Sequence, residues 1–585
     1  MYVNFGEQIR RLSLHTCNIS ALAWVHNGAV ETDTAQRSPI LTVRGLEVGF
    51  QSQDGYTRAV SDIDIDVRPG ELVALLGESG SGKTVTARAI MGVQDPAAVI
   101  AAAEMRLDDI ALLDLDEEGR RRLRGERMSM VMQDALSALN PVLTIGDQIG
   151  EVFRVHRRMG RRQARARAID LLDLVGISSP LTRIDDYPHQ FSGGMRQRIL
   201  IAMAIALEPD LLIADEPTTA LDVTVQAQIL RLLHDLRERL DMAVLLITHD
   251  IGVVAEVADR VIVMRDGSIV EAGDADRVFS NPEKPYTRTL LASAPHPEPA
   301  RVLSEPEPAL EPTDDTILQV TGLRRRFRTG HALARRAVVA VDGIDLVLRP
   351  GETLGIVGES GSGKSTLARM IVGLESADEG QVLYRGQDIT RRARGPRPPS
   401  QPGIQMIFQD PYTSLDPRMR VRDVIAEPLT VTRTGTPSSR RDRVADLLEL
   451  VGMKPDMMHR FPHQFSGGQR QRIGIARSLM RDPDILVCDE PVSALDVTIQ
   501  AQVVDLLTDI QDRLGLGILF ISHDLSVVRN LAHRVLVMYQ GEQVETGDVA
   551  EIFDDPQQDY TKRLLASIPP LTRAERGKLT GRSAA

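Results

Sequence analysis

Two glycine-rich segments of this 585-residue sequence have the residue types and spacing needed to bind the phosphates of a nucleotide. Residues 77–84 read GESGSGKT, and residues 358–365 read GESGSGKS. Both match G-x-x-x-x-G-K-[ST] and follow a short apolar run, as a strand–loop–helix phosphate cradle requires. The glycines let backbone N–H groups approach the phosphates, and the lysine adds a full positive charge. The residues expected to bind phosphate are Gly77, Glu78, Ser79, Gly80, Ser81, Gly82, Lys83 and Thr84, and Gly358, Glu359, Ser360, Gly361, Ser362, Gly363, Lys364 and Ser365.

An acidic pair follows an apolar strand pattern in each half of the chain. Asp215 and Glu216 end the run LLIADE, and Asp489 and Glu490 end ILVCDE. The aspartate can hold Mg²⁺, directly or through water, and the glutamate can polarise an attacking water as a general base. Such a pair can also be the solvated start of a loop. Its recurrence after both phosphate-binding loops favours the nucleotide site.

A histidine and a glutamine extend each set. The two histidines end apolar strands at the same place in both halves, which favours a γ-phosphate contact over a structural hydrogen bond. The two glutamines follow the strands SMVM and QMIF, where an amide can orient water and Mg²⁺. We therefore predict catalytic roles for Glu216, His249, Glu490 and His523, and Mg²⁺ contacts for Thr84, Gln133, Asp215, Ser365, Gln409 and Asp489; both glutamines also count among the ATP-binding residues.

A second kind of phosphate-binding element is also present twice. FSGGMRQR at 191–198 and FSGGQRQR at 465–472 each open a helical pattern with Ser-Gly-Gly, which makes an anion-binding helix N-terminus. Each half thus has two phosphate-binding helix ends, although one γ-phosphate needs one cradle. This is explained if the two halves pair head to tail, so that the Ser-Gly-Gly helix end of each half closes over the phosphate-binding loop of the other. The ATP-binding residues expected here are Ser192, Gly193, Gly194, Ser466, Gly467 and Gly468.

The elements that position these residues form two long repeats. From the Ser-Gly-Gly segments onward, the paired motifs keep a constant spacing, which predicts two whole domains rather than a solenoid. In each repeat, short β-rich runs such as LLIAD and AVLLIT alternate with helical patterns, which indicates α/β domains with largely parallel sheets. A helix is expected around ARAIDLLDLVG, with Leu171, Leu172 and Leu174 in its core.

Composition limits the classes of protein that fit. Lys and Arg total 69 against 81 Asp and Glu, and the net charge of −12 argues against a protein that mainly grips nucleic acid. No run approaches 18 apolar residues, so no membrane span is expected. Two cysteines exclude a disulfide framework. Residues 391–402 read as a solvated loop, with a basic contact to anionic lipid or nucleic acid as the alternative.

Taken together, these motifs resemble the ATP-binding subunits of ABC transporters from about residue 40 to residue 570. The resemblance covers Walker A, the Q-loop, the FSGG[MQ] signature, Walker B with its glutamate, the switch histidines, and D-loops at residues 220–222 and 494–496. It implies two tandem P-loop NTPase domains, each with a RecA-like α/β core, a helical subdomain and a small antiparallel β-subdomain. It also implies an ATPase that uses Mg²⁺, with two composite sites at the interface of an intramolecular pseudo-dimer.

Two segments narrow the branch. NPEKPYTRTLLAS at 281–293 and its echo DPQQDYTKRLLAS at 555–567 are similar to the tails of oligopeptide, dipeptide and nickel importer ATPases. This implies an importer ATPase for di- or oligopeptides at the cytoplasmic face of the plasma membrane. Its partners would be two permease subunits, as a heterodimer, and an extracytoplasmic substrate-binding protein, with no nucleic acid. Met195 replaces the usual Gln of the signature, and we expect little loss of phosphate binding from this change. The C-terminal tail has no cysteine, so neither an iron–sulfur cluster nor zinc is predicted.

The expected boundaries follow composition. Residues 1–38 form an N-terminal extension, 39–295 the first ATPase domain, 296–315 a Pro/Glu-rich linker, 316–570 the second domain, and 571–585 a disordered tail.

Three matters stay open in the sequence. Phe50 and Phe327 are candidates for stacking on adenine, with Tyr56 as a rival and a core role as the alternative. The cargo could instead be a nickel chelate, glutathione or a sugar. A soluble, ribosome-associated twin-cassette ATPase is a rival function. Its linker should be long, charged and helical, whereas this one is short, acidic and Pro-rich.

Overall fold

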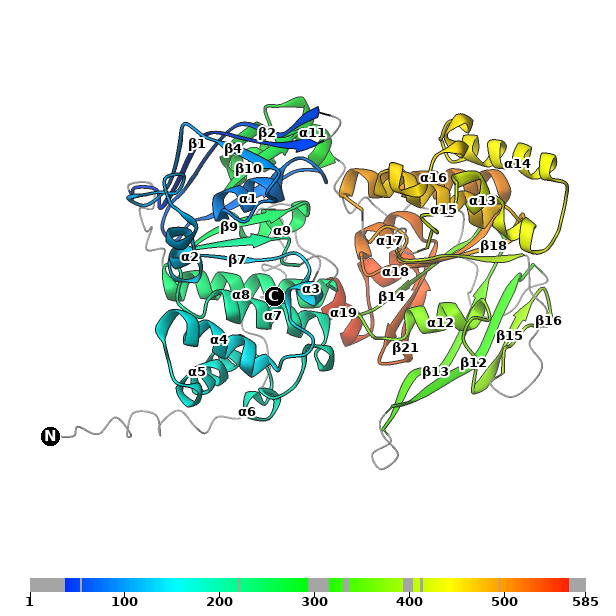
Figure 1. Ribbon diagram of the computed structural model, residues 1–585. Coiled ribbons are helices and arrows are strands. Elements are labelled where there is room, and N and C mark those ends of the chain that lie inside the picture. Colours follow the sequence, from blue (N-terminus) through cyan, green and yellow to red (C-terminus); the bar gives the residue numbers. More distant parts are fainter. Residues whose placement is uncertain are drawn as a thin grey trace.

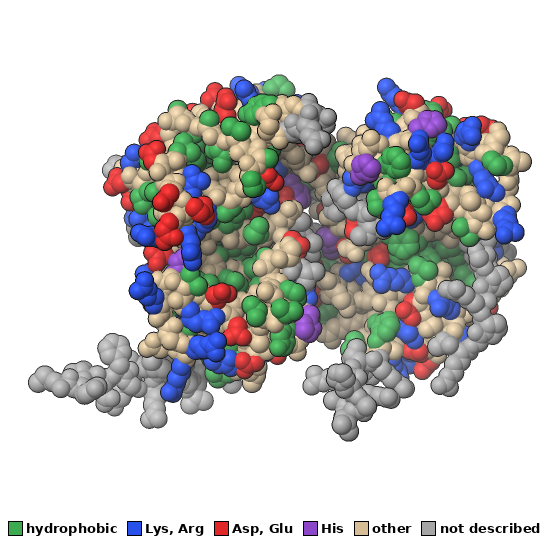
Figure 2. Space-filling view, in the orientation of Figure 1, with side chains coloured by type: hydrophobic (Ala, Val, Ile, Leu, Met, Phe, Trp, Pro, Cys, Tyr) green, Lys and Arg blue, Asp and Glu red, His purple; other side chains and the backbone are tan. Residues whose placement is uncertain are grey.

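The computed structural model describes residues 37–52, 55–218, 221–292, 315–329, 336–392, 403–410, 414–493 and 495–567. Figure 1 shows two units side by side, one built from the first half of the chain and one from the second, and Figure 2 shows a groove between them on the viewed face. The predicted C-terminal tail, and nearly all of the predicted linker, N-terminal extension and 391–402 loop, lie outside the described residues.

The first unit is built on a six-stranded sheet. Its order is β11-β10-β3-β9-β8-β7, parallel except for the β10–β11 pair. The strand β3 is apolar throughout because both of its faces are covered. Its Val73 and Leu75 face one hydrophobic cluster, whereas Leu72, Ala74 and Leu76 face the other. The strands are β3 (Leu72–Leu76), β7 (Met128–Val131), β8 (Leu211–Asp215), β9 (Ala243–Thr248), β10 (Arg260–Arg265) and β11 (Ser268–Asp274).

An antiparallel sheet and one helix cover the face of Val73 and Leu75. The sheet has the order β2-β1-β5-β6, with β4 also paired to β1, and its apolar side chains share one cluster with those of the helix α1. The elements are β1 (Leu41–Ser52), β2 (Gly55–Val67), β4 (Ala98–Ala101), β5 (Glu104–Leu107), β6 (Ile110–Ala111) and α1 (Lys83–Met91).

Helices cover the opposite face and form a helical subdomain. Leu172 of α5 is fully buried there and Leu171 packs against the same cluster. Leu174 is exposed, so its predicted core position is wrong: two residues on from Leu172, a helix turns it to the opposite side. Apart from α1, the helices of this unit are α2 (Glu117–Glu126), whose Leu123 packs on the first face, and α3 (Ala135–Ala138), α4 (Ile145–Arg157), α5 (Arg161–Leu174), α6 (Pro180–Arg183), η3 (Pro188–Gln190), α7 (Gly193–Ala204), α8 (Val223–Leu240), α9 (Ile251–Val257), α10 (Ala275–Ser280) and α11 (Pro285–Ala292).

The second unit repeats this topology, with sheet orders β17-β18-β19-β14-β20-β21 and β13-β12-β15-β16. The predicted fold of two tandem α/β domains, each with a helical and an antiparallel β-subdomain, is therefore confirmed. Among the described residues, no helix combines the length and apolar character that a bilayer span requires. The strands are β12 (Leu318–Thr329), β13 (Arg336–Leu348), β14 (Thr353–Val357), β15 (Glu379–Tyr384), β16 (Gln387–Asp388), β17 (Ile404–Ile407), β18 (Ile485–Asp489), β19 (Gly517–Ile521), β20 (Arg534–Tyr539) and β21 (Glu542–Asp548). The helices are α12 (Lys364–Ile371), α13 (Val421–Val431), α14 (Pro437–Leu450), η4 (Pro455–His459), η5 (Pro462–Gln464), α15 (Gly467–Leu479), α16 (Val497–Leu514), α17 (Leu525–Leu531), α18 (Val549–Asp554) and α19 (Asp559–Leu565).

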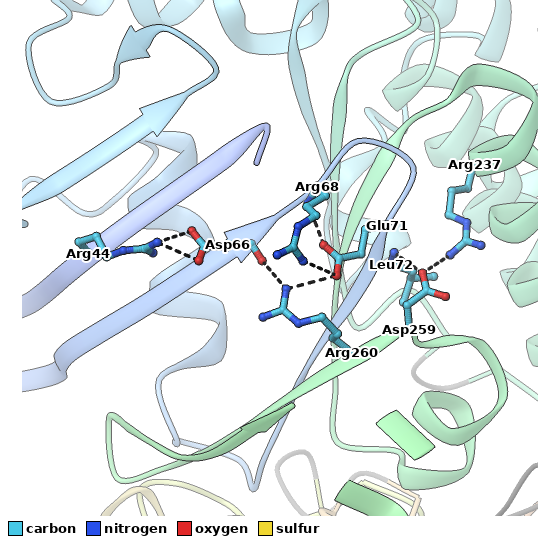
Figure 3. Close-up of polar contacts among 8 residues, drawn as sticks. All are labelled: Arg44, Asp66, Arg68, Glu71, Leu72, Arg237, Asp259 and Arg260. Atoms are coloured by element: carbon cyan, nitrogen blue, oxygen red, sulfur yellow. Dashed lines mark hydrogen bonds and ion pairs between the residues drawn. The ribbon is translucent and has the colours of Figure 1, made fainter. Parts of the chain in front are cut away.

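A polar network fixes the start of β3, the strand that leads into the first phosphate-binding loop (Figure 3). The backbone N–H of Leu72 donates to the Asp259 carboxylate at 2.8 Å, and Arg237 donates to the same carboxylate at 2.7 Å. Beside it, Arg260 donates to Glu71 at 3.2 Å. Asp259 and Arg260 lie at the start of β10 and Arg237 lies near the end of α8, so these bonds tie the start of β3 to a neighbouring strand and helix.

The second unit anchors β14 at the same place with different chemistry. The N–H of Thr353 donates to Nδ1 of His533 at 3.0 Å, and the Thr353 hydroxyl donates to Gln511 at 3.1 Å. Arg534 still donates to Glu352, at 2.9 Å. The charged pair Asp259 and Arg237 of the first unit is thus replaced in the second unit by two neutral side chains, His533 and Gln511.

Candidate active site

The first phosphate-binding loop joins the end of β3 to the start of α1. Gly82 caps the helix at a φ of 98°, and a Cβ there would lie 2.9 Å from the Ala59 carbonyl oxygen, so glycine is required. The ammonium of Lys83 donates to the carbonyls of Gly77 at 2.7 Å and Glu78 at 2.8 Å. These bonds hold the lysine over its own loop, where the backbone N–H groups and its charge can serve a phosphate.

The second loop has the same geometry. Lys364 donates to the carbonyls of Gly358 at 2.7 Å and Glu359 at 2.9 Å. Burial lowers the pKa of Lys364, although the nearby carboxylates, Glu490 first among them, oppose the shift. Burial lowers the pKa of Lys83 in the same way against Glu216. Both ammonium groups therefore lie in low-dielectric surroundings, where their attraction for a phosphate is strengthened.

Two of the three predicted Mg²⁺ residues of each unit lie together at the edge of its sheet, whereas Gln133 and Gln409 donate to Glu216 and Glu490 instead. The Thr84 hydroxyl donates to Oδ1 of Asp215 at 3.0 Å, and the Ser365 hydroxyl donates to Oδ1 of Asp489 at 2.8 Å. Burial raises the pKa of both aspartates, partly offset by these hydroxyls. A buried carboxylate beside a hydroxyl, both hard oxygen ligands, fits Mg²⁺, whose charge would offset the cost of that burial.

Glu216 is held at the end of β8 by two neighbours and by its backbone. Its φ is 47°, and its N–H donates to the carbonyl of Ile247 at 2.8 Å, which ties this left-handed conformation to β9. Gln133 donates to Oε2 of Glu216 at 2.6 Å, and Nδ1 of His249 lies 3.0 Å from Oε1. The glutamine loop and the histidine loop therefore converge on one carboxylate.

The second unit repeats this arrangement at Glu490, also at a φ of 47°. Gln409 donates to Oε2 of Glu490 at 2.7 Å, and Nδ1 of His523 lies 3.3 Å from the same oxygen. Burial alone would raise the pKa of Glu490, but the hydrogen bond and charge of His523, together with Lys364 and Gln409, outweigh it and lower that pKa. Conversely, burial of His523 is outweighed by Glu490, so the histidine pKa is raised. The carboxylate stays ionised, as a general base must.

The two Ser-Gly-Gly segments cap helices, as their sequence predicts. Ser192 caps α7 and Ser466 caps α15, each accepting a bond from the N–H three residues on, at 3.4 Å. A Cβ on Gly194 would lie 2.3 Å from Cγ1 of Val225, because α8 packs directly on α7. The second glycine is therefore also a packing requirement, which the sequence reasoning missed.

The signature of the second unit carries one more bond than that of the first. The side chain of Gln469 accepts from the N–H of Ser466 at 3.2 Å and completes a capping box. Met195 occupies this position in the first unit, and its sulfur instead accepts a contact from Arg183 at 3.4 Å. The serine cap itself is retained in both units.

Charges connect the two units at the D-loops. Asp222 caps α8 and Asp496 caps α16. Against the lowering effect of burial, Asp496 of the second unit helps to raise the pKa of Lys83, and Asp222 of the first unit does so for Lys364. Each D-loop acid thus lies within electrostatic range of the other unit's phosphate-binding lysine. Among the described residues, neither signature serine forms a hydrogen bond with the opposite loop; Ala220 and Ala494 of the D-loops lie outside them.

The three aromatic candidates for adenine occupy different surroundings. Phe50 is partly buried and packs against the core of the first unit. Tyr56 is 49% exposed and its ring lies over Gly49. The guanidinium of Arg325 lies 4.8 Å from the centre of the Phe327 ring. Stacking on adenine stays a prediction for all three.

Comparison with known families decides what these sites belong to. The ABC transporter family matches residues 60–219 and 341–493, and so covers more than half of the chain. The chain belongs to the ABC transporter family. Residues 270–316 and 544–585 of this ABC protein also match the family described as "Oligopeptide/dipeptide transporter, C-terminal region".

Known ABC proteins resemble this one over nearly its full length. It is 44% identical over 565 residues to "Glutathione import ATP-binding protein GsiA" of Salmonella choleraesuis (92% of this chain, 91% of that protein). It is 48% identical over 542 residues to "Peptidoglycan transport ATP-binding protein YejF" of Agrobacterium fabrum (92% and 97%). It is 43% identical over 613 residues to "Oligopeptide transport ATP-binding protein OppD" of Mycobacterium tuberculosis (92% and 100%). The chain is thus an ABC transporter ATPase with two ATP-binding domains, and the predicted family is confirmed.

Proposed function

We propose that this protein is the ATP-hydrolysing subunit of an importer for di- or oligopeptides. The observation that carries the proposal is the tail, because the oligopeptide/dipeptide C-terminal region begins within the last strand of the central sheet, β11 or β21, in both units. The names of the relatives refer to glutathione, peptidoglycan and oligopeptides, and so support a peptide or a compound built from one. Domain limits at 39–295 and 316–570 fit the described elements, which run from Leu41 to Ala292 and from Leu318 to Leu565.

We propose two composite ATP sites. In the first, Glu216 accepts a proton from the attacking water while the water oxygen bonds to the γ-phosphorus and the bond to ADP breaks. Lys83 stabilises the charge that develops on the phosphoryl group, and Gln133 and His249 hold the carboxylate. Bound Mg²⁺, held by Thr84 and Asp215, would supply further positive charge. The second unit contributes Ser466, Gly467 and Gly468 to this site, and the second site pairs Lys364, Ser365, Gln409, Asp489, Glu490 and His523 with Ser192, Gly193 and Gly194.

The partners in this proposal are two permease subunits, as a heterodimer, and an extracytoplasmic substrate-binding protein. The ATPase would bind peripherally at the cytoplasmic face of the plasma membrane. Exposed apolar side chains next to the first glutamine loop support a docking surface there: Met132 is 45% exposed and Val142 is 76% exposed. The site residues around Gln133 lie directly beside this surface, which would couple hydrolysis to the permeases.

Co-purification tests the proposal. The chain is expected to copurify with two membrane permeases, and the binding protein of the same transporter is expected to gain thermal stability with di- or oligopeptides. If only glutathione, a nickel chelate or a sugar raises the thermal stability of the binding protein, then that compound is the cargo and peptides are not. Co-sedimentation with ribosomes, without permeases, would instead favour the soluble twin-cassette ATPase.

A further inference from the structure

The C-terminal tail helix of the second unit touches the phosphate-binding loop. Tyr560, in the first turn of α19, is 8% exposed, and its hydroxyl accepts a hydrogen bond from the backbone N–H of Glu359 at 3.2 Å. Its ring packs on Tyr539, at the end of β20, with centres 4.3 Å apart. A segment 201 residues away in the chain thus contacts the second residue of the Walker A loop.

A carboxylate fixes where this helix begins. Glu545 of β21 accepts backbone N–H bonds from Gln557 at 2.7 Å and Gln558 at 3.2 Å, directly before α19. These two bonds tie the entry of the helix to the central sheet. Because Tyr560 follows two residues later, the position of its hydroxyl depends on this tie.

The first unit has the same construction. Glu271, which is 6% exposed, accepts from the N–H groups of Glu283 at 2.9 Å and Lys284 at 3.1 Å. Tyr286 follows, with the guanidinium of Arg265 at 4.8 Å from its ring centre in the place that Tyr539 has in the second unit. Its hydroxyl is buried beside Glu78 without a hydrogen bond of regular geometry. Two copies of one arrangement, with different ring neighbours, argue against an accidental contact.

The peptide groups of Glu359 are held from two directions. Tyr560 binds its N–H, and Lys364 binds its carbonyl at 2.9 Å. The lysine ammonium is also the group that a phosphate attracts, so its bond to the loop competes with the nucleotide. The tyrosine bond does not compete. Burial raises the pKa of Tyr560 to about 12, so the hydroxyl stays neutral at physiological pH.

We propose that the tail helices α11 and α19 are positioning elements of the ATPase. Tyr560 sets the backbone of the second phosphate-binding loop at Glu359 through its hydrogen bond, and Tyr286 packs at the equivalent residue, Glu78, in the first. Figure 1 places α19 where the two units meet, and the charge of Asp222 from the first unit also acts on Tyr560. The tail helix of the second unit therefore lies between its own phosphate-binding loop and the first unit. This inference rests on the ATPase identity and not on the peptide cargo, so the binding-protein screen and the test below fail independently.

The test measures MgATP binding to the full-length chain carrying Lys83→Ala, so that the second loop dominates the signal. Tyr560→Phe removes the hydroxyl and keeps the ring, and it is expected to raise the Kd for MgATP by about 2- to 12-fold, the value of one hydrogen bond. Tyr539→Phe is the matched control, because that hydroxyl bonds only the exposed side chain of Gln540 among the described residues. Its Kd should stay within about 1.5-fold of the parent.

Two further readouts separate positioning from folding. Without nucleotide, both variants should still unfold in one cooperative transition, with the larger loss of stability in Tyr560→Phe, because its bond to Glu359 is already present there. Only Tyr560→Phe should raise the Kd. Glu545→Gln should also raise the Kd, and its effect should not add to that of Tyr560→Phe, since both act through one contact. Equal Kd values for the two tyrosine variants, or a Kd change in Tyr560→Phe that comes with a partly unfolded chain before nucleotide is added, would overturn the proposal. Additive effects would overturn the role of Glu545.

Discussion

At the scale of single residues, the outcome of the chemistry depends on one carboxylate in each unit. Glu216 and Glu490 share a left-handed backbone conformation, a glutamine donor and a histidine neighbour. Such a conformation costs about 1–3 kcal/mol for a residue other than glycine, so it persists only where its surroundings impose it. The bond from the Glu216 N–H to β9 is that constraint.

Glu216→Gln and Glu490→Gln should each impair turnover strongly. Loss of a general base lowers the rate of a step by about 10²- to 10⁴-fold, and the amide can no longer take the proton. Phosphate release by the purified transporter measures the effect, and MgATP binding should be retained in both variants. Near-normal transport by either variant would show that one site is enough.

The titration of His523 gives a second test at this scale. The Glu490 carboxylate raises the pKa of His523 against the effect of burial, so the stabilisation from this pair is present below pH about 6.5 and is lost as pH rises through the raised pKa. In Glu490→Gln the burial effect should prevail, and the pKa should fall below about 6.5. NMR titration of labelled histidine measures it, with exposed Glu542→Gln as control. An unchanged pKa would contradict the pairing.

At the scale of elements, the strands that lead into the two phosphate-binding loops are anchored by different groups. In the first unit the Leu72 N–H bonds a carboxylate that Arg237 neutralises, whereas in the second unit the Thr353 N–H bonds the neutral form of His533. Burial lowers the pKa of His533, against the opposing charge of Glu352. We therefore expect the two copies of the fold to respond differently to acid.

The second unit should lose stability as pH falls below about 6.5, because the unfolded chain takes up a proton that the folded His533 refuses. The slope from this group is at most about 1.4 kcal/mol per pH unit. The variant His533→Asp with Gln511→Arg copies the first unit and should lose less melting temperature between pH 7.5 and 5.5. His523 has the opposite trend but is common to both proteins, so the difference reports His533. If the melting temperatures of the parent and of this double variant fall in parallel as the pH is lowered, the role of His533 is refuted.

Packing of the signature helices supplies another test. Gly194→Ala would place a Cβ 2.3 Å from Val225 and should cost about 1–3 kcal/mol through overpacking of α7 on α8. Gly193→Ala is the matched control, since its Cβ would meet Leu221 at 3.5 Å, an ordinary contact. Urea unfolding of the full chain compares them. If Val225→Ala fails to restore Gly194→Ala, the clash is not the cause.

At the scale of the whole molecule, the two units are coupled through their D-loops. Asp496 acts on Lys83 and Asp222 acts on Lys364, so charge from each unit reaches the other unit's phosphate-binding loop. Figures 1 and 2 show the units next to each other with a groove between them. Because both units belong to one chain, each molecule of the protein supplies one copy of each unit.

Double variants test whether the sites are shared in the proposed order. Ser466→Ala added to Lys83→Ala should lower ATP turnover no further, because both changes disable the first site. Ser466→Ala added to Lys364→Ala should abolish the remaining turnover, because the two changes disable different sites. Phosphate release measures all four proteins. The reverse pattern would mean that each signature serves its own unit.

The sequence by itself determined the family, the two-domain fold and the residues that meet within each unit. This was possible because a phosphate-binding loop is a local device: Gly82, Lys83 and Thr84 are neighbours in the chain, and parallel strands bring Asp215, Glu216, Gln133 and His249 to one edge of one sheet. Because each motif occurs twice, a residue assigned in one unit could be compared with its counterpart in the other.

Only the tertiary structure decided contacts whose partners lie far apart and carry no local pattern. The tail motif was visible in sequence, but its hydroxyl contact with Glu359 depends on where Glu545 ties the start of α19. The replacement of Asp259 by His533 was also readable, yet its effect required knowing that each receives the N–H of a buried strand. Such bonds arise from the packing of elements against one another, and a linear pattern records each element without its neighbours.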